Sequence, residues 1–148
     1  MNRDFIAMLS ALFAAGADYL VVGAHALAAL GCPRATGDLD LWLRPTPENA
    51  ERVLEALREF GAPLHDLSVQ DLTSDGTVFQ IGVPPCRIDL LTSITGVSFD
   101  EAWAGRNEIA IGALTVPVLG RTEFIRNKRA LGRPKDLADL AILDEAGP

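Results

Sequence analysis

Asp38 and Asp40 stand two positions apart in a segment where polar and apolar side chains alternate. Because a strand repeats every two residues, the alternation over residues 38–43 predicts a strand with both carboxylates on one face. Two carboxylates held side by side repel each other unless a positive charge lies between them. Oxygen ligands of this kind suit Mg²⁺ or Mn²⁺ better than zinc. The pair therefore predicts a divalent-cation site, with a solvated outer strand face as the alternative.

A third aspartate, Asp89, lies in the apolar stretch of residues 88–91, where an unpaired charge is unfavourable. If the strand of residues 87–91 neighbours that of residues 38–43, three carboxylates converge. Two metal ions roughly 3.5–4 Å apart can then hold the attacking and leaving oxygens of a phosphoryl transfer. One carboxylate can also act as a general base. The alternative is that Asp89 pairs with Arg87 or caps a backbone group.

Gly23 lies between an apolar strand at residues 19–22 and a short helix that follows it. Backbone N–H groups at a helix start attract anions, and glycine lets the backbone turn sharply and approach a phosphate closely. The alternative is an ordinary turn between a strand and a helix. His25, just beyond, either packs and caps locally or contacts a phosphate or a base. Trp42, on the aspartate-bearing strand face, either stacks on a base or lies at the edge of the core.

The order of the expected elements indicates one mixed-sheet α/β (α+β) domain over residues 1–148, with helices covering the sheet and two helices at the C-terminal end. Apolar periodicity and turn residues locate these elements. Helices are expected at residues 3–15, 24–30, 47–60, 122–131 and 136–143, with a helical turn at 99–103. Strands are expected at residues 19–22, 38–43, 78–83, 87–91, 108–111 and 114–118.

The composition narrows the classes of function. The chain has 148 residues, a net charge of −7 and 49% hydrophobic residues, which suits a folded domain and excludes disorder. The acidic balance argues against broad nonspecific nucleic-acid binding, whereas the cluster of basic residues at 121–135 favours a local anionic ligand. Because there is no long apolar run and residues 1–4 lack the charge pattern of a signal peptide, we expect a cytoplasmic protein with no membrane partner.

A glycine turn after a strand, an Asp-x-Asp motif on the next strand and a later acidic strand residue together resemble the DNA polymerase β-like nucleotidyltransferase superfamily. The residues that carry this resemblance are Val22-Gly23-Ala24, Asp38-Leu39-Asp40 and Asp89. Residues 21–26 and 33–40 are similar to a group of small bacterial stand-alone nucleotidyltransferases close to the toxin-type (AbiEii-like) enzymes. That group also tends to end in a Lys-rich helix followed by Arg-x-Lys-Asp-x-x-Asp, which corresponds here to Lys128 and residues 133–139. The resemblance spans residues 3 to 143.

The resemblance implies a nucleotidyltransferase fold and a nucleoside triphosphate held through Mg²⁺ by Asp38 and Asp40, with Asp89 completing a catalytic trio. It implies transfer of a nucleoside monophosphate to an acceptor hydroxyl of RNA, a protein or a small molecule, with release of pyrophosphate. A role related to toxin–antitoxin systems follows from the AbiEii-like group. The candidate nucleotide-binding residues are Gly23, Ala24, His25, Arg34, Thr36, Lys128, Lys135 and Asp136, of which Asp136 is expected to orient a basic group.

The chain departs from the superfamily at position 24, where Ala replaces the usual Ser or Gly. A hydroxyl contact to phosphate is therefore absent, although the backbone N–H remains. The chain also lacks the additional substrate-binding domain of many relatives, so a homodimer or a protein partner is expected to complete an acceptor site. These departures motivate a second hypothesis, a non-catalytic nucleotide-binding or antitoxin-like relative that acts through a protein partner.

Overall fold

The computed structural model describes residues 1–33, 36–145 and 147, and the strands within them form one mixed sheet of six strands. Their order across the sheet is β3-β4-β2-β1-β6-β5. The β2–β4 and β1–β6 pairs are parallel, and the remaining neighbours are antiparallel. The strands are β1 (Tyr19–Val22), β2 (Asp38–Leu43), β3 (Val78–Ile81), β4 (Arg87–Leu91), β5 (Asn107–Ile111) and β6 (Leu114–Val118).

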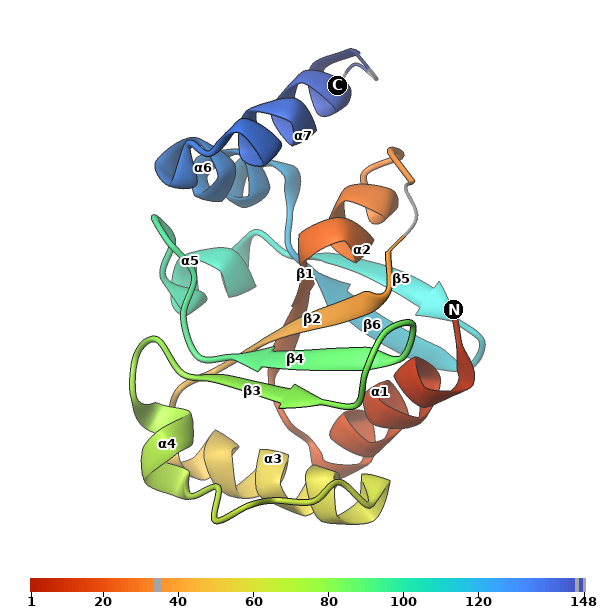
Figure 1. Cartoon of the computed structure of the whole chain (residues 1–148), viewed down its shortest axis with the longest axis vertical. Coiled ribbons are helices and arrows are strands. Elements are labelled where there is room, and N and C mark those ends of the chain that lie inside the picture. Colours follow the sequence, from red (N-terminus) through yellow and green to blue (C-terminus); the bar gives the residue numbers. More distant parts are fainter. Residues whose placement is uncertain (34–35, 146, 148) are drawn as a thin grey trace.

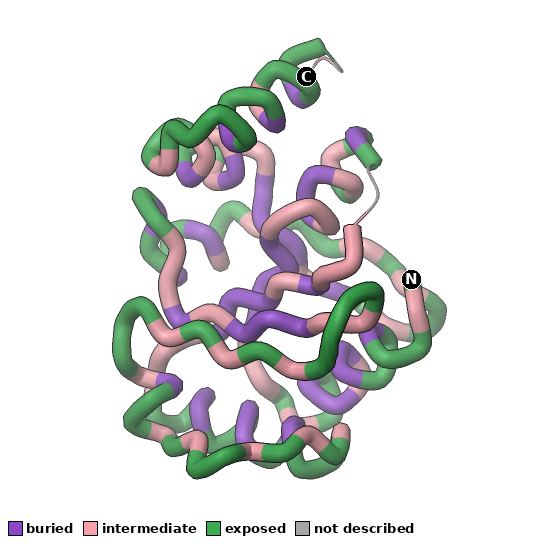
Figure 2. The backbone as a smooth tube through the Cα atoms, in the orientation of Figure 1, coloured by how far each residue is buried: buried purple, intermediate pink, exposed green. Residues whose placement is uncertain are grey.

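Helices cover both faces of this sheet (Figure 1). One face carries α1 (Arg3–Ala15), α3 (Pro47–Phe60) and α4 (Val69–Thr73), and the other carries α2 (Gly23–Ala29), α5 (Phe99–Ala104), α6 (Arg121–Leu131) and α7 (Pro134–Glu145). Buried residues concentrate along the central strands and on the inner sides of the helices (Figure 2). On β2, Leu39 and Leu41 are fully buried, whereas Asp38 and Asp40 remain partly exposed. The alternation of side chains thus separates the core from the acidic face.

The helix boundaries follow from capping residues in the sequence. The Asn2 side chain accepts a hydrogen bond of 2.9 Å from the backbone N–H of Phe5 and so begins α1. The Thr46 side chain caps the start of α3 in the same way. Gly16 and Gly61, with φ angles of 71° and 89°, end the two helices in the left-handed conformation that glycine adopts at lowest cost.

The predicted fold class is confirmed, because the described residues form a mixed α/β sheet with flanking helices and two C-terminal helices. The bounds of the expected elements differ from the observed ones by at most two residues. The sequence analysis missed α4, although Ser68 and Asp71 form a reciprocal capping box at its start. None of the helices in the described part of the chain has the length and apolar character needed to cross a lipid bilayer.

Candidate functional site

The strands that carry the three aspartates are neighbours and run parallel. Asp40 lies opposite Asp89 in the β2–β4 register, and Asp38 lies opposite Arg87. Because side chains at matching register positions of neighbouring strands lie on the same face, the three carboxylates share one face of the sheet. The strand adjacency on which the three-carboxylate hypothesis depended is therefore present.

Gly23 begins α2 and lies directly against Asp40. Its φ of 69° falls in the left-handed region, where any residue with a side chain is strained. A Cβ atom placed on Gly23 overlaps Asp40 Oδ2. The glycine therefore leaves room for a carboxylate, a reason that the sequence alone does not reveal. The expected contact between this turn, including Ala24, and a phosphate stays a prediction.

Arg87 bridges two of the three carboxylates. Its Nη2 donates hydrogen bonds to Asp38 Oδ2 at 2.8 Å and to Asp89 Oδ2 at 3.2 Å. Its Nε also lies 3.2 Å from Asp89 Oδ1. The pairing of Asp89 with Arg87, which the sequence left as an alternative to a catalytic role, is thus present. The additional bridge to Asp38 depends on the parallel register, which sequence reasoning did not anticipate.

Asp40 differs from the other two carboxylates, because within the described residues it has no ion-pair partner. Burial raises the pKa of Asp40 from 3.8 to about 6, and the negative charges of Asp89 and Asp38 add to this rise. The positive charges of Arg87 and Lys128 lower the pKa of Asp40 but do not outweigh these effects. The acidic face therefore has an uncompensated negative charge that favours a bound cation.

Lys128 reaches toward this face from α6 and is held by two buried aspartates of α7. Its Nζ lies 3.4 Å from Asp136 Oδ1 and 3.4 Å from Asp139 Oδ2. Asp136 is completely buried and also accepts a 2.6 Å hydrogen bond from Nε of Arg133. Hydrogen bonds from Arg133 lower the pKa of Asp136 to about 2. Asp136 therefore contacts two basic groups, while its expected role in orienting them toward a nucleotide stays a prediction; sequence reasoning gave no role to Asp139.

The remaining candidate nucleotide-binding residues lie in different environments. The Thr36 hydroxyl contacts the backbone of Asp38 at 3.2–3.3 Å, directly before the first aspartate. Lys135 is exposed on α7. Arg34 lies outside the described residues. The binding roles of all three stay predictions.

His25 is the third residue of α2, two positions after Gly23. Its ring makes an edge contact with Phe5 at a centroid distance of 5.6 Å. Burial and the positive charge of the N-terminus lower the pKa of His25, and a hydrogen bond to the Asp38 backbone opposes this. The ring is therefore neutral at pH 7 and supports the packing between α1 and α2. A contact with nucleotide stays a prediction.

The hypothesis that Trp42 stacks on a base is wrong for this structure. Trp42 is buried to 2% exposure and packs edge-on against Phe99 at a centroid distance of 5.2 Å. It shares the face of Asp38 and Asp40, as alternation predicts, but α5 covers that end of the strand. Trp42 therefore belongs to the core, which was the other interpretation of the sequence.

The three aspartates fit a divalent cation by type and register, but they do not form a ready-made cage. Carboxylate oxygens are the ligands that Mg²⁺ and Mn²⁺ prefer, and Asp89 Oδ1 is buried without a hydrogen-bond partner. Among the described residues, however, no three His, Cys, Asp or Glu side chains stand in an arrangement that holds a metal ion. Two of the three carboxylates are engaged instead by the guanidinium of Arg87.

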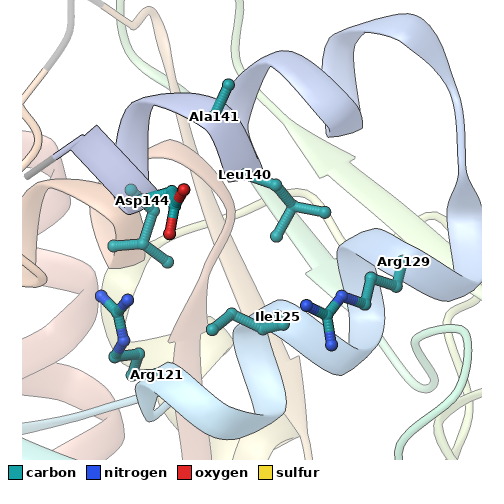
Figure 3. Close-up of a pocket in the computed structure, with 7 residues that line it drawn as sticks. Arg121, Ile125, Arg129, Leu140, Ala141 and Asp144 are labelled. Carbon is teal, nitrogen blue, oxygen red and sulfur yellow. The ribbon is translucent and has the colours of Figure 1, made fainter. Parts of the chain in front are cut away.

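A cavity of about 300 Å³ lies between α6 and α7, away from the carboxylates (Figure 3). Arg121 and Arg129 stand at its two ends, with Ile125 of the same helix between them. Leu140, Ala141, Leu143 and Asp144 of α7 complete its wall. None of the candidate site residues in the described part of the chain lines this cavity.

Comparisons with known proteins show the fold of the chain. No protein-family model matches it. No curated protein matches it significantly. Among solved structures, it is similar to a Thermotoga maritima protein described as a "putative nucleotidyltransferase", with a TM-score of 0.62 and 16% sequence identity. The match covers 94% of this chain and 89% of the other. The two proteins therefore share a fold.

Proposed function

We propose that this protein is a nucleotidyltransferase that moves a nucleoside monophosphate from a nucleoside triphosphate to an acceptor hydroxyl. The observation that carries the proposal is the parallel β2–β4 register, which gathers Asp38, Asp40 and Asp89 on one face beside the Gly23 turn. The shared fold supports it, as does the resemblance of the motifs to small bacterial, AbiEii-like nucleotidyltransferases. RNA, a protein or a small molecule can supply the hydroxyl.

The transfer exchanges one bond to phosphorus for another. The acceptor oxygen attacks the α-phosphorus, the bond from that phosphorus to the oxygen bridging to the β-phosphate breaks, and pyrophosphate leaves with the electron pair. Asp89 is suited to accept the hydroxyl proton, because its Oδ1 accepts no hydrogen bond and is contacted only by the Arg87 guanidinium at 3.2 Å among the ion pairs of the described residues. Lys128, whose charge reaches Asp40, is suited to bind a phosphate oxygen.

Asp38, Asp40 and Asp89 are the residues that hold Mg²⁺ or Mn²⁺ in this proposal. Their hard oxygen donors suit either ion, and the raised pKa of Asp40 reflects an excess of negative charge that a cation relieves. When bound, such an ion neutralises phosphate charge and polarises the phosphorus that is attacked. The protein supplies the fixed carboxylates, because two adjacent strands hold them.

The test is transfer of label from each α-³²P nucleoside triphosphate, with Mg²⁺, to RNA, protein and small hydroxyl acceptors. Asp38→Asn, Asp40→Asn and Asp89→Asn are each expected to lower transfer at least a hundredfold while remaining folded. Glu51→Gln removes an exposed acid on α3 and serves as the matched control. Absence of labelled product, together with absence of saturable Mg²⁺ and nucleotide binding by the wild-type protein, refutes the proposal.

A second candidate is a non-catalytic relative that binds nucleotide and acts through a protein partner, in the manner of an antitoxin. Ala24 favours it, because the hydroxyl usual at this position is missing beside the Gly23 turn. Thermal stabilisation by ATP and Mg²⁺ without turnover, together with a co-purifying partner, distinguishes this candidate. Turnover by the isolated chain excludes it.

A further inference from the structure

Arg87 contacts two of the three aspartates that are proposed to bind a cation. It lies in register with Asp38 and two residues before Asp89, so that one guanidinium reaches both carboxylates. The oxygens it engages are Asp38 Oδ2 and both oxygens of Asp89. Asp40 alone keeps its carboxylate outside this arrangement, against Gly23.

We propose that Arg87 is a built-in counter-ion that holds Asp38 and Asp89 in the metal-free protein and competes with a divalent cation for them. This inference rests on the proposed function, because it assumes that the same carboxylates bind Mg²⁺. In this proposal, the protein passes from a state in which Arg87 neutralises Asp38 and Asp89 to a state in which a divalent cation neutralises them. Loss of the Arg87 charge therefore tightens Mg²⁺ binding instead of weakening it.

The ion pair between Arg87 and Asp38 is suited to replacement of the guanidinium by a divalent cation. The side chains of Arg87 and Asp38 are 30% and 32% exposed, so water reaches both partners and softens their attraction. The contact between Arg87 Nε and Asp89 Oδ1 measures 3.2 Å, yet neither atom makes a hydrogen bond of acceptable geometry there. Water therefore weakens the pairing of the guanidinium with Asp38, whereas the Asp89 side chain is only 11% exposed and its contact with Arg87 Nε lacks a hydrogen bond.

The two possible roles of Arg87, competing with a cation and positioning the carboxylates, predict opposite changes in Mg²⁺ affinity when Arg87 is removed. If Arg87 only positioned the carboxylates for a cation, its removal would leave them disordered and would weaken Mg²⁺ binding. If it competes, removal frees three carboxylate oxygens and leaves three like charges close together. The metal-free protein then melts at a lower temperature, whereas Mg²⁺ binds more tightly and raises the melting temperature by more than in the wild-type protein.

The experiment is titration of Mg²⁺ alone, without nucleotide, into metal-stripped protein, followed by calorimetry and by thermal melting. Arg87→Gln is expected to tighten Mg²⁺ binding roughly threefold to tenfold, because the Arg87–Asp38 pair that it removes is partly exposed and therefore weak. Arg44→Gln is the matched control. Arg44 also bridges two acids, Asp18 and Asp100, at 2.8 and 2.7 Å, and its loss is expected to leave Mg²⁺ binding unchanged.

A second measurement uses the folded wild-type protein and so does not depend on the stability of the variant. The Nε–Hε resonance of Arg87, identified by its loss in Arg87→Lys, is expected to shift on addition of saturating Mg²⁺ as the guanidinium leaves Asp89. If Mg²⁺ binds the wild-type protein, an unmoved resonance or an Arg87→Gln affinity that is equal or weaker overturns the inference alone. If neither protein binds Mg²⁺, both this inference and the proposed function fall.

Discussion

Replacement of Asp40 by asparagine is expected to stabilise the metal-free protein at neutral pH. Burial and the charges of Asp89 and Asp38 raise the pKa of Asp40 from 3.8 to about 6. Because the pKa of Asp40 is higher in the folded protein than in the unfolded chain, the folded state binds the proton more tightly. The stabilisation from protonated Asp40 is therefore complete below pH 3.8, and the free energy of unfolding falls as pH rises through about 6. Since one pKa unit corresponds to about 1.4 kcal/mol, ionised Asp40 opposes folding by about 3 kcal/mol at pH 7.5.

The measurement compares the free energy of unfolding of the wild-type protein and Asp40→Asn in urea, with EDTA, at pH 4.5 and pH 7.5. Asparagine cannot ionise, so other effects of the substitution appear at both pH values and cancel in the comparison. Between these pH values, the advantage of Asp40→Asn over the wild type is expected to grow by about 2 kcal/mol. In a domain of this size that corresponds to an increase of about 6 °C in the difference between their melting temperatures.

Asp38→Asn is the matched control for this prediction. Asp38 accepts a 2.8 Å hydrogen bond from Arg87, so its removal deprives a cation of its partner and brings no gain at pH 7.5. If the advantage of Asp40→Asn is the same at both pH values, Asp40 ionises normally in the folded protein. The description of the acidic face as a site of uncompensated charge is then refuted.

Three further predictions concern the glycine turn beside Asp40, the buried ion pairs of Lys128 and the pH dependence of Mg²⁺ binding. Gly23→Ala is expected to lower the free energy of unfolding by at least about 3 kcal/mol, because strain at positive φ adds to overlap with Asp40. Gly16→Ala is the control, since Gly16 has a φ of 71° but lies in open space, and it is expected to lose only about 1 kcal/mol in the same urea titration. Lys128→Met is expected to cost about 3 kcal/mol by leaving buried carboxylates short of a partner; Arg126→Gln, which breaks an exposed pair, should leave the melting temperature unchanged, and equal melting of the two variants contradicts the assignment. The Mg²⁺ affinity measured by calorimetry is expected to tighten about tenfold from pH 5 to pH 7, as the ionised fraction of Asp40 rises through its pKa of about 6, and a flat pH profile excludes Asp40 as a ligand.

Much of the fold could be predicted from local sequence, because the signals that define each element act over a few residues. Apolar periodicity and the glycines that follow α1 and α3 marked the bounds of these helices in the sequence. Alternation along residues 38–43 placed Asp38 and Asp40 opposite the buried leucines. The short α4 was missed because its five residues carry little apolar periodicity, although its capping box is visible in the sequence.

The features that could not be predicted are those set by strand order and register. The parallel β2–β4 pairing places Arg87 beside Asp38, and nothing in the local sequence determines that partner. Trp42 shows the same limit, because alternation gave its face correctly but could not show that α5 covers it. The buried pairing of Lys128 with Asp139 likewise depends on the packing of α7 against α6.

The distribution of positive charge around the acidic face predicts where the proposed cation would enter. Arg87 is engaged by Asp38 and Asp89, and Lys128 is engaged by Asp136 and Asp139. Within the described residues, Asp40 is the one member of the trio with no ion pair of its own, and Gly23 prevents any side chain at that turn from covering it. If the proposed site binds a divalent ion, we expect the ion to meet its least compensated ligand at Asp40 first and to reach Asp38 and Asp89 as Arg87 withdraws. We therefore expect loss of Asp40 to abolish cation binding and loss of Arg87 to enhance it.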